Sequence, residues 1–299
     1  MMQAQLENTI DIWDEIVAYE TLWALPQQTL KTISDLFRSH QVLPSELLAR
    51  CSRNELFDTV GVLKKEVEDY LSTFNGFSVC VNGTYHYPVR LRNARYPIEL
   101  FYYKGDIGLL ESPSISIVGA RKCTEDGARR AKKLSRNLGE AGFTVVSGLA
   151  RGIDTVAIEE TLSLGGNVVG VIGTPINRYY PPENRKLQDR LAEEKLLISQ
   201  VPFYVYAKEP FAAKRLHFPQ RNETMAALSE ATVIVEASDT SGALTQARAC
   251  LQQGRRLFIL DSCFENPGIT WPRSFEKKGA IRVKDIADVV SVLGDSAGR

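Results

Sequence analysis

The feature that most constrains this sequence is an alternation of short apolar runs with longer polar segments between residues 114 and 260. The apolar runs cover residues 114–118, 143–147, 168–172, 196–199, 232–236 and 256–260. The segments between them carry helical patterns, the clearest over residues 125–140 with Thr124 as its cap. Short apolar strands separated by helices build βαβ units and a parallel sheet. We therefore predict an α/β fold, a Rossmann-like, doubly wound, mostly parallel sheet.

The residues before this alternation predict a small N-terminal all-helical domain. Residues 26–37, a segment that begins at Pro44, and residues 61–71 carry apolar side chains at helical spacing. Proline fits the first turn of a helix, so Pro26 and Pro44 are expected to open theirs. We assign this domain to residues 1–73.

The remaining segments flank the sheet domain, which we place at residues 112–262. Residues 74–111 change to aromatic and β-branched runs broken by turn residues, so we expect connecting strands and loops there. The expected strands are 79–81, 85–91 and 100–103. Residues 263–299 predict a C-terminal extension with one short helix over 285–293.

Cysteine usage and hydropathy exclude several classes of protein. The five cysteines are scattered without a Cys-x-x-Cys pair, and the chain has three histidines, so we expect no metal site and no disulfide framework. No apolar run approaches the ~20 residues of a membrane span, and no signal peptide is evident. We predict a cytoplasmic protein without a cofactor and without membrane association.

The charge of the chain is neutral in total but uneven along its length. The chain has 36 basic and 36 acidic residues. Residues 1–111 hold 10 basic and 15 acidic residues, residues 112–260 hold 20 and 15, and residues 261–299 hold 6 and 6. The net charges are therefore −5, +5 and 0, and the excess of positive charge lies in the predicted sheet.

Glycines at the ends of the predicted strands mark a candidate anion site. The strand ends read Gly119-Ala120-Arg121, Ser147-Gly148-Leu149-Ala150-Arg151-Gly152-Ile153-Asp154, Gly173-Thr174-Pro175, and Glu236 followed by Ser241-Gly242. Ligands of open parallel sheets bind beyond the carboxyl ends of the strands, and glycine allows close approach of the backbone. The set indicates phosphates along one edge of the sheet.

The chemistry at the first strand end does not match a dinucleotide site. Neither the glycine-rich dinucleotide fingerprint nor a P-loop lysine follows the strand. Arg121 suits a single phosphate held by a bidentate guanidinium. The alternative is that Gly119 makes a tight turn and Arg121 is solvated.

The order and spacing of these motifs resemble the DNA-processing protein A family (DprA/Smf), of which the chain looks like a divergent member. The motifs are Ile117-Val118-Gly119-Ala120-Arg121, Ser147 to Asp154, Tyr180-Pro181-Pro182-Glu183-Asn184, Phe218-Pro219-Gln220-Arg221-Asn222 and Ser241-Gly242-Ala243-Leu244. The resemblance covers residues 90–260. The helical first third lies where the family often has a domain of sterile-alpha-motif or helix-hairpin-helix type.

The resemblance implies single-stranded DNA binding without base specificity by a homodimer that is not an enzyme. It further implies a RecA-type recombinase as partner, in DNA recombination or natural transformation. Arg121 would hold a phosphate, Ser147, Gly148 and Gly152 would lend hydrogen-bond donors, and Arg178, Arg221 and Asn222 would line the pocket.

Reasoning from the residues themselves adds further candidates for this pocket. Single-strand binding needs a positive groove with aromatic faces, and both residue types occur in these loops. The additional candidates are Gly119, Arg151, Lys214, Ser241 and Gly242. The aromatic residues are Tyr179, Tyr180, Phe203, Tyr204, Tyr206 and Phe218, and for more than half of them we expect packing. We assign Lys132, Lys133 and Arg136 to a solvated helix face.

Three departures from the family pattern fall near the predicted pocket. Ile158 stands where the family usually has histidine, Glu223 where it has arginine, and Gln200 where it has glutamate. We expect these changes to leave the pocket with fewer phosphate contacts.

A second function belongs to another class, a nucleotide-ligand sensor or a hydrolase of the N-glycosidic bond of nucleoside monophosphates. Such hydrolases need a carboxylate near the ribose, and Asp154, Glu183 and Glu236 are the candidates. The glycine-rich signature of these hydrolases is missing, and Ser241-Gly242-Ala243-Leu244 takes its place. For Asp154 a helix cap, and for Glu236 a hydrogen bond to a neighbouring turn, are the simpler roles.

Overall fold

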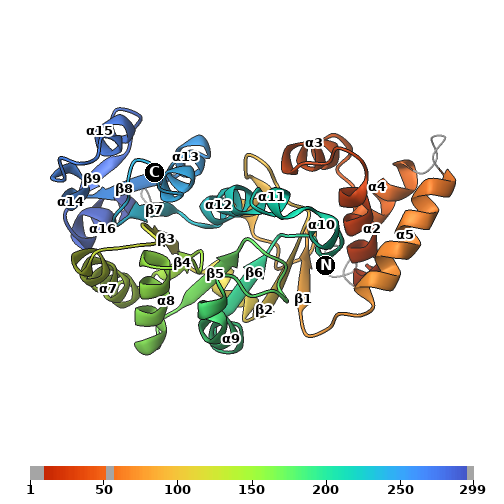
Figure 1. The fold of residues 1–299 in the computed structure, drawn as a ribbon, viewed down its shortest axis with the longest axis horizontal. Helices are drawn as coiled ribbons and strands as arrows, with labels where there is room; N and C mark the ends of the chain where they lie inside the picture. The colour runs from red at the N-terminus through yellow and green to blue at the C-terminus, as the bar shows by residue number, and fades with distance from the viewer. Residues whose placement is uncertain (1–9, 52–56, 295–299) are drawn as a thin grey trace.

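The computed structural model describes residues 10–51 and 57–294, and these form one nine-stranded sheet with helices on both faces (Figure 1). The strands are β1 (Ser78–Val81), β2 (Leu100–Gly105), β3 (Ser114–Val118), β4 (Thr144–Ser147), β5 (Val168–Ile172), β6 (Leu196–Ser199), β7 (Ala231–Ile234), β8 (Arg256–Leu260) and β9 (Ile281–Val283).

The strand order is β1-β2-β6-β5-β4-β3-β7-β8-β9. Strands β3 to β9 are all parallel where they pair, and β2 is antiparallel to both β1 and β6. From β3 the chain builds outward to β6 on one side and then returns to β7 on the other. The predicted doubly wound, mostly parallel sheet is confirmed, with its topological switch point between β3 and β7.

The sheet continues beyond residues 112–262. Strands β1 and β2 come from the segment expected as a connection, and β9 comes from the expected C-terminal extension. The division of the chain into domains at the proposed bounds stays a prediction.

Helices cover both faces of the sheet and one of its ends (Figure 1). Helices α7 (Glu125–Glu140), α8 (Ile153–Ser163) and α9 (Arg185–Glu194) lie on one face, and α12 (His217–Leu228) and α13 (Ala243–Gln252) lie on the other. The N-terminal helices α2 (Ile12–Ala24), α3 (Leu30–His40), α4 (Pro44–Cys51) and α5 (Phe57–Leu71) lie beyond β1. The remaining helices are α6 (Val89–Arg92), α10 (Phe203–Lys208), α11 (Phe211–Lys214), α14 (Asp261–Phe264), α15 (Trp271–Glu276) and α16 (Ile286–Gly294).

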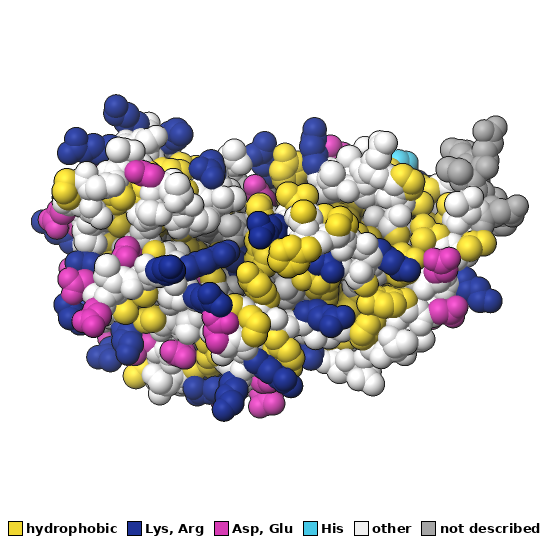
Figure 2. Space-filling model, viewed as in Figure 1, with side chains coloured by type: hydrophobic (Ala, Val, Ile, Leu, Met, Phe, Trp, Pro, Cys, Tyr) yellow, Lys and Arg dark blue, Asp and Glu magenta, His cyan; other side chains and the backbone are white. Residues whose placement is uncertain are grey.

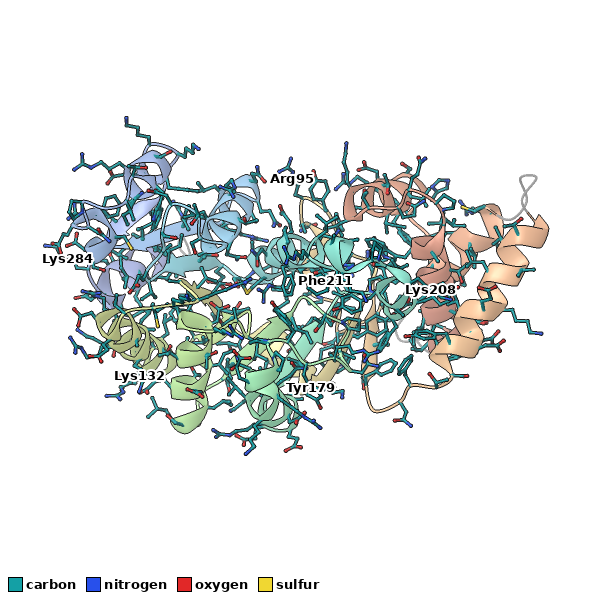
Figure 3. All side chains as sticks on the ribbon, viewed as in Figure 1. Arg95, Lys132, Tyr179, Lys208, Phe211 and Lys284 are labelled. Carbon is teal, nitrogen blue, oxygen red and sulfur yellow. The ribbon has the colours of Figure 1, made fainter. Side chains whose placement is uncertain are left out.

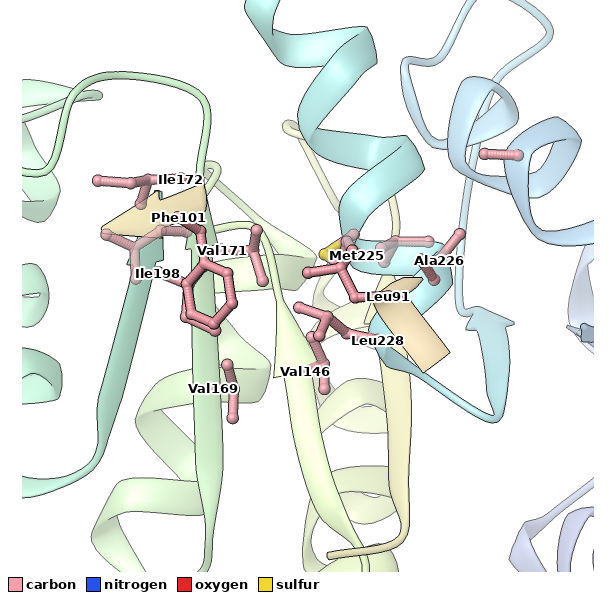
Figure 4. Packing of buried hydrophobic residues seen from close by; sticks show 14 of the residues in the cluster. Leu91, Phe101, Val146, Val169, Val171, Ile172, Ile198, Met225, Ala226 and Leu228 are labelled. Carbon is pink, nitrogen blue, oxygen red and sulfur yellow. The ribbon is translucent and has the colours of Figure 1, made fainter. Parts of the chain in front are cut away.

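The hydrophobic core extends from the N-terminal helices to α16, and one part of it lies between α12 and the strands of the sheet (Figure 4). Met225 and Leu228 of α12 are buried with Val146 of β4 and Val171 of β5. All five side chains of β3 are buried, because helices cover both faces of the sheet at its centre. Burial on both faces explains why these strands read as continuous apolar runs in the sequence.

Local signals placed many elements correctly, but one predicted strand and the start of one predicted helix are wrong. The helix over 125–140 is confirmed with its Thr124 cap, whose Oγ1 accepts from the Gly127 amide at 2.9 Å. The strand expected over 85–91 is wrong, because Pro88 precedes the short helix α6 there. Helix α3 begins at Leu30 rather than Pro26, because Thr29 and Thr32 form a capping box.

Helix α2 and the helices α10 to α12 were not predicted. Residues 15–23 of α2 are all buried, so the helix shows no amphipathic period to read. The segment that holds α10 to α12 was expected as loops. Pro202 precedes α10 and Pro210 precedes α11, and these two helices have only six and four residues.

A buried carboxylate joins the N-terminal helices to the sheet. Glu20 of α2 is fully buried and accepts from the amide of Phe203 at 2.7 Å and the amide of Tyr204 at 2.9 Å. The hydroxyl of Tyr102 on β2 also donates to it. Burial raises the pKa of Glu20 to about 7, although the hydrogen bonds from Tyr102, Phe203 and Tyr204 act in the opposite direction.

The raised pKa of Glu20 predicts a pH-dependent contribution to stability. The folded state keeps the proton up to about pH 7, whereas the unfolded state releases it near pH 4.5. Stability from this group is therefore present below pH 4.5 and falls as the pH rises to about 7, by up to about 3 kcal/mol. We expect the free energy of unfolding of the wild-type chain, relative to Glu20→Gln, to fall across this range in urea titrations. Parallel pH profiles for the two proteins would contradict this account.

Candidate nucleic-acid interface

The carboxyl ends of the parallel strands open onto four connected hollows, which we call the strand-end groove. The first, of about 720 Å³, lies at the switch point between β3 and β7. The second and third share Arg121 with it, and the fourth joins them at Tyr180. The predicted residues that line the groove are Gly119, Arg121, Gly148, Arg151, Arg178, Lys214, Arg221, Asn222, Ser241 and Gly242.

The walls of the strand-end groove are strongly basic. Eight basic residues line it, against three acidic ones, Asp154, Glu236 and Glu265. The basic residues are Arg121, Lys122, Arg130, Arg151, Arg178, Lys214, Arg215 and Arg221. Figure 2 shows Lys and Arg side chains gathered along the centre of this face. A neutral chain therefore carries a local positive field that attracts polyanions.

Arg121 projects from a strand end that is fixed on two sides. The amide of Ala120 donates to the Glu236 carbonyl at 2.7 Å, and its carbonyl accepts from the Ile153 amide at 3.2 Å. A Cβ at Gly119 would lie 2.5 Å from Cγ1 of Ile153, so glycine is required for this close approach. The exposed Arg121 side chain itself makes no hydrogen bond or ion pair with any residue that the structure describes.

Arg221 is buried and holds the strand ends together from α12. Its Nη1 donates to the carbonyl of Val171 at 2.6 Å and also to the carbonyl of Gly148, and its Nε donates to Oδ1 of Asn222 at 3.0 Å. The amide of Gly148 donates to Asp154 at 3.1 Å. A Cβ at Gly148 would collide with the guanidinium, so the position of Arg221 requires glycine at residue 148.

The charges of Asp154 and Arg221 stabilise each other in this buried position. Burial raises the pKa of Asp154 to about 6, and the positive charge of Arg221 works against that rise. Burial also lowers the pKa of Arg221, opposed by the charge of Asp154. Because the donors of Arg221 go largely to backbone carbonyls, the residue shapes the groove more than it offers donors to a ligand.

Ser147 and Gly152, which were predicted as pocket donors, have other surroundings. Ser147 is fully buried, and its Oγ donates to the Ile117 carbonyl at 2.8 Å. Gly152 has φ +74° and passes so close to the Ala120 carbonyl that a Cβ would collide with it. Neither residue is among the lining residues of the groove.

The fourth hollow brings Arg178 and Lys214 together. Lys214 places its Nζ 4.8 Å from the centroid of the Tyr206 ring, a cation–π distance. Arg178 is exposed and lines the same hollow, in the turn after β5. The two predicted cations therefore lie beside an aromatic face.

The aromatic residues of these loops divide into packed and exposed groups. Phe203 and Tyr204 are buried and belong to the core. Tyr180 remains 45% exposed in the groove, with its ring centroid 5.1 Å from that of Phe218. Tyr179 is exposed beside Arg185, whose guanidinium lies 4.8 Å from the ring centroid.

The three departures from the family pattern lie away from the groove. Ile158 is fully buried in the core, and Gln200 is buried and accepts from the Thr224 hydroxyl. Glu223 lies against α13, where its Oε2 accepts from Nε2 of Gln253 at 3.2 Å. None of the three lines the groove, so the expectation that they reduce its phosphate contacts has no support in their positions.

The three carboxylates considered for hydrolysis all have partners. Glu236 accepts from the amide of Thr124 at 3.1 Å and from its hydroxyl at 2.7 Å, as expected for a bond to a neighbouring turn. Glu183 forms an ion pair with Arg151, which holds the pKa of Glu183 below its usual value. Asp154 binds the loop before its helix rather than capping the helix, since the cap position is Gly152.

Two further features are absent from the described ranges 10–51 and 57–294. These residues hold no cluster of three or more His, Cys, Asp or Glu side chains that could bind a metal ion. They also contain no helix long and apolar enough to cross a membrane.

A comparison of sequences decides the family. The sequence model described as DNA recombination-mediator protein A matches residues 78–294, well over half of the chain. The chain belongs to this family. The resemblance seen in the strand-end motifs is thereby confirmed, and the family is one of recombination mediators.

Named relatives agree with this membership. The DNA processing protein DprA of Streptococcus pneumoniae is 36% identical over 161 residues, 54% of this chain and 55% of that protein. Protein Smf of Escherichia coli is 32% identical over 234 residues, 77% of this chain and 61% of that protein. The chain thus spans little more than half the length of these curated family relatives.

Solved structures of family members share the fold. The X-ray structure of DprA from Streptococcus pneumoniae superposes with a TM-score of 0.75 at 26% identity, covering 94% of this chain and 98% of that one. DprA from Helicobacter pylori, described in its single-stranded DNA binding mode, gives a TM-score of 0.62 at 25% identity, covering 74% and 96%.

The surroundings of Arg221 and Arg121 predict a large loss of stability for one substitution and almost no change for the other. Arg221→Met removes the hydrogen bonds to two strand ends and the positive charge that favours ionised Asp154, and it should cost about 3–5 kcal/mol of unfolding free energy. Arg121→Met removes an exposed side chain without partners and should change stability by less than about 0.5 kcal/mol. Urea unfolding of both variants tests this, and equal stability of Arg221→Met and the wild-type chain would contradict the role given to Arg221.

Proposed function

We propose that the chain binds single-stranded DNA without base specificity in the strand-end groove. Arg121 is the central phosphate contact, with Lys122, Arg178 and Lys214 along the same groove. The protein works by binding and not by catalysis, since the mediator family assists a recombination reaction that another protein carries out.

The observation that carries this proposal is the position of Arg121. Its side chain borders three of the four hollows, is exposed and has no protein partner among the described residues. A guanidinium matches the geometry of a phosphate and holds it through two parallel hydrogen bonds. The single-stranded DNA binding mode described for the Helicobacter pylori relative supports the same ligand for this chain.

The lining of the groove supports binding of DNA without preference for base sequence. The basic residues extend along connected hollows that are also lined by the exposed rings of Tyr179 and Tyr180. Cations and aromatic faces together can follow a single-stranded backbone and stack its bases. Such contacts do not read base edges, so affinity should be similar for oligonucleotides of different sequence.

The effect of salt on the affinity tests this function. We expect Arg121→Ala to weaken binding of a fluorescent oligonucleotide and to reduce the slope of log K against log salt by about 0.7, one phosphate contact on a single strand. Fluorescence anisotropy at several salt concentrations measures both quantities. Absence of binding by the wild-type chain at low salt would overturn the proposal, and release of free base from nucleoside monophosphates would favour the hydrolase.

Lys132→Ala provides the matched control for this experiment. Lys132 is an exposed cation on α7, on the margin of the molecule away from the strand-end groove (Figure 3). Because it borders none of the hollows, its loss should leave the salt slope unchanged. An equal effect of both substitutions would show that net charge, and not the groove, governs binding.

We propose further that the bound strand is handed to a RecA-type recombinase by a homodimer of this chain. The mediator description of the family supports the partner. The chain should accelerate recombinase assembly on DNA coated with single-strand-binding protein, and Arg121→Ala should lose this acceleration.

The homodimer is tested by the mass of the protein in solution. Light scattering should give a mass of about twice 33.3 kDa. Wild-type and Arg121→Ala chains of equal activity, or a monomeric mass, would each refute the corresponding part.

A further inference from the structure

Helix α11 stands between two hollows of the strand-end groove and turns a different cation toward each. Arg215, directly after α11, lines the second hollow together with Arg121. Lys214, the last residue of α11, lines the fourth hollow together with Arg178. A phosphate backbone that follows the groove between these hollows must therefore pass α11.

Phe211, the first residue of α11, is exposed at this position. It is 75% exposed, and Figure 3 places it in the central part of the face. The guanidinium of Arg215 lies 5.4 Å from the centroid of its ring, one helical turn further along the chain. The ring is thus held beside a cation of the second hollow while most of its surface stays accessible to a ligand.

Phe211 is not the only exposed apolar side chain near this hollow. Leu216 is 62% exposed just after α11. Tyr180 is 45% exposed and lines the second hollow together with Arg215.

The charge of the segment that holds Phe211 selects an anionic partner. Between residues 201 and 222 the basic residues are Lys208, Lys214, Arg215 and Arg221, and the acidic residue is Glu209. Glu209 already accepts from Nε2 of His217 at 2.7 Å. A ligand for this surface must combine negative charges with flat apolar faces, and a nucleic-acid single strand has both in every nucleotide.

We propose that Phe211 is a base-stacking platform, on which one base of the single strand lies while Arg215 and Arg121 hold the adjoining phosphate. The inference rests on the proposed single-stranded DNA binding and adds to it the residue that contacts a base face. Stacking on an aromatic ring tolerates any base, because every base has a π face. The contact therefore increases affinity without introducing sequence preference.

Oligonucleotides with and without bases test the platform. Phe211→Ala should weaken binding of an ordinary oligonucleotide by roughly 5- to 150-fold. It should leave the salt slope at the wild-type value, since no phosphate contact is lost. On an oligonucleotide of the same length made of abasic sites, Phe211→Ala and the wild-type chain should bind equally, because the ring then has no base to stack on.

Two further variants control the experiment. Phe211→Trp keeps an aromatic face and should retain the wild-type affinity, with quenching of the new tryptophan fluorescence on binding. Tyr85→Ala removes a ring that is also 75% exposed. The neighbouring His86 lies 3.8 Å from the carboxylate of Glu111, which precedes β3, so Tyr85 is near the amino end of that strand and not the carboxyl end. It should have no effect on binding.

The outcomes separate this inference from the proposed function. Wild-type binding with unchanged affinity in Phe211→Ala would overturn the platform and leave the function standing. Equal losses on ordinary and abasic oligonucleotides would also overturn it, since Phe211 would then act by supporting the loop or by binding another partner. Failure of the wild-type chain to bind any single strand would overturn both.

Discussion

The geometry of the strand-end groove depends on the buried guanidinium of Arg221. It joins α12 to the carbonyl groups of Gly148 and Val171, at the ends of two neighbouring strands. Asp154 holds the same loop by accepting a hydrogen bond from the amide of Gly148. A buried charge needs hydrogen bonds and an opposite charge nearby. Arg221 has its hydrogen bonds to the two carbonyl groups, and the negative charge of Asp154 favours its charged form. The loop is thus held rigid enough for Leu149 to adopt φ +56°, a conformation that a leucine keeps only when its surroundings impose it.

The N-terminus of α7, the first helix after β3, cannot bind a phosphate as the corresponding helix does in nucleotide-binding folds. In those folds the N-terminus of this helix binds the phosphate. Here the carboxylate of Glu236 already occupies that position, where it accepts from the amide and hydroxyl of Thr124. An anion in the groove must therefore be held by side chains, foremost Arg121. Flexible side chains can bind a polymer backbone in many registers, whereas backbone amides at a helix N-terminus bind one small ligand in one position. Because Glu236 occupies the helix N-terminus, the site favours a nucleic-acid strand over a mononucleotide.

The sequence predicted what local patterns determine and missed what tertiary contacts determine. The strand over 114–118 and its following helix were correct, because apolar runs, glycine and a threonine cap are local signals. Helix α2 was not predicted because burial on all its sides removes the amphipathic period from the sequence. Arg121 was identifiable because it comes two residues after the glycine that ends a predicted strand. The burial of Arg221 and the outward direction of Glu223, away from the groove, depend on how α12 lies against the sheet and α13, and no spacing in the sequence records that.

The number of cations in the groove overstates the charge available to a ligand. Arg151 is paired with Glu183, and the donors of Arg221 go mostly to backbone carbonyls. The side chains of Arg121, Lys122, Arg130 and Arg178 have no hydrogen bond or ion pair with the part of the chain that the structure describes. A strand in this groove then gains fewer phosphate contacts than its length would allow, and contacts with base faces must supply a larger share of the affinity. The exposed rings beside these cations are in the right place to do so, and such contacts lose little strength in salt because they involve no phosphate.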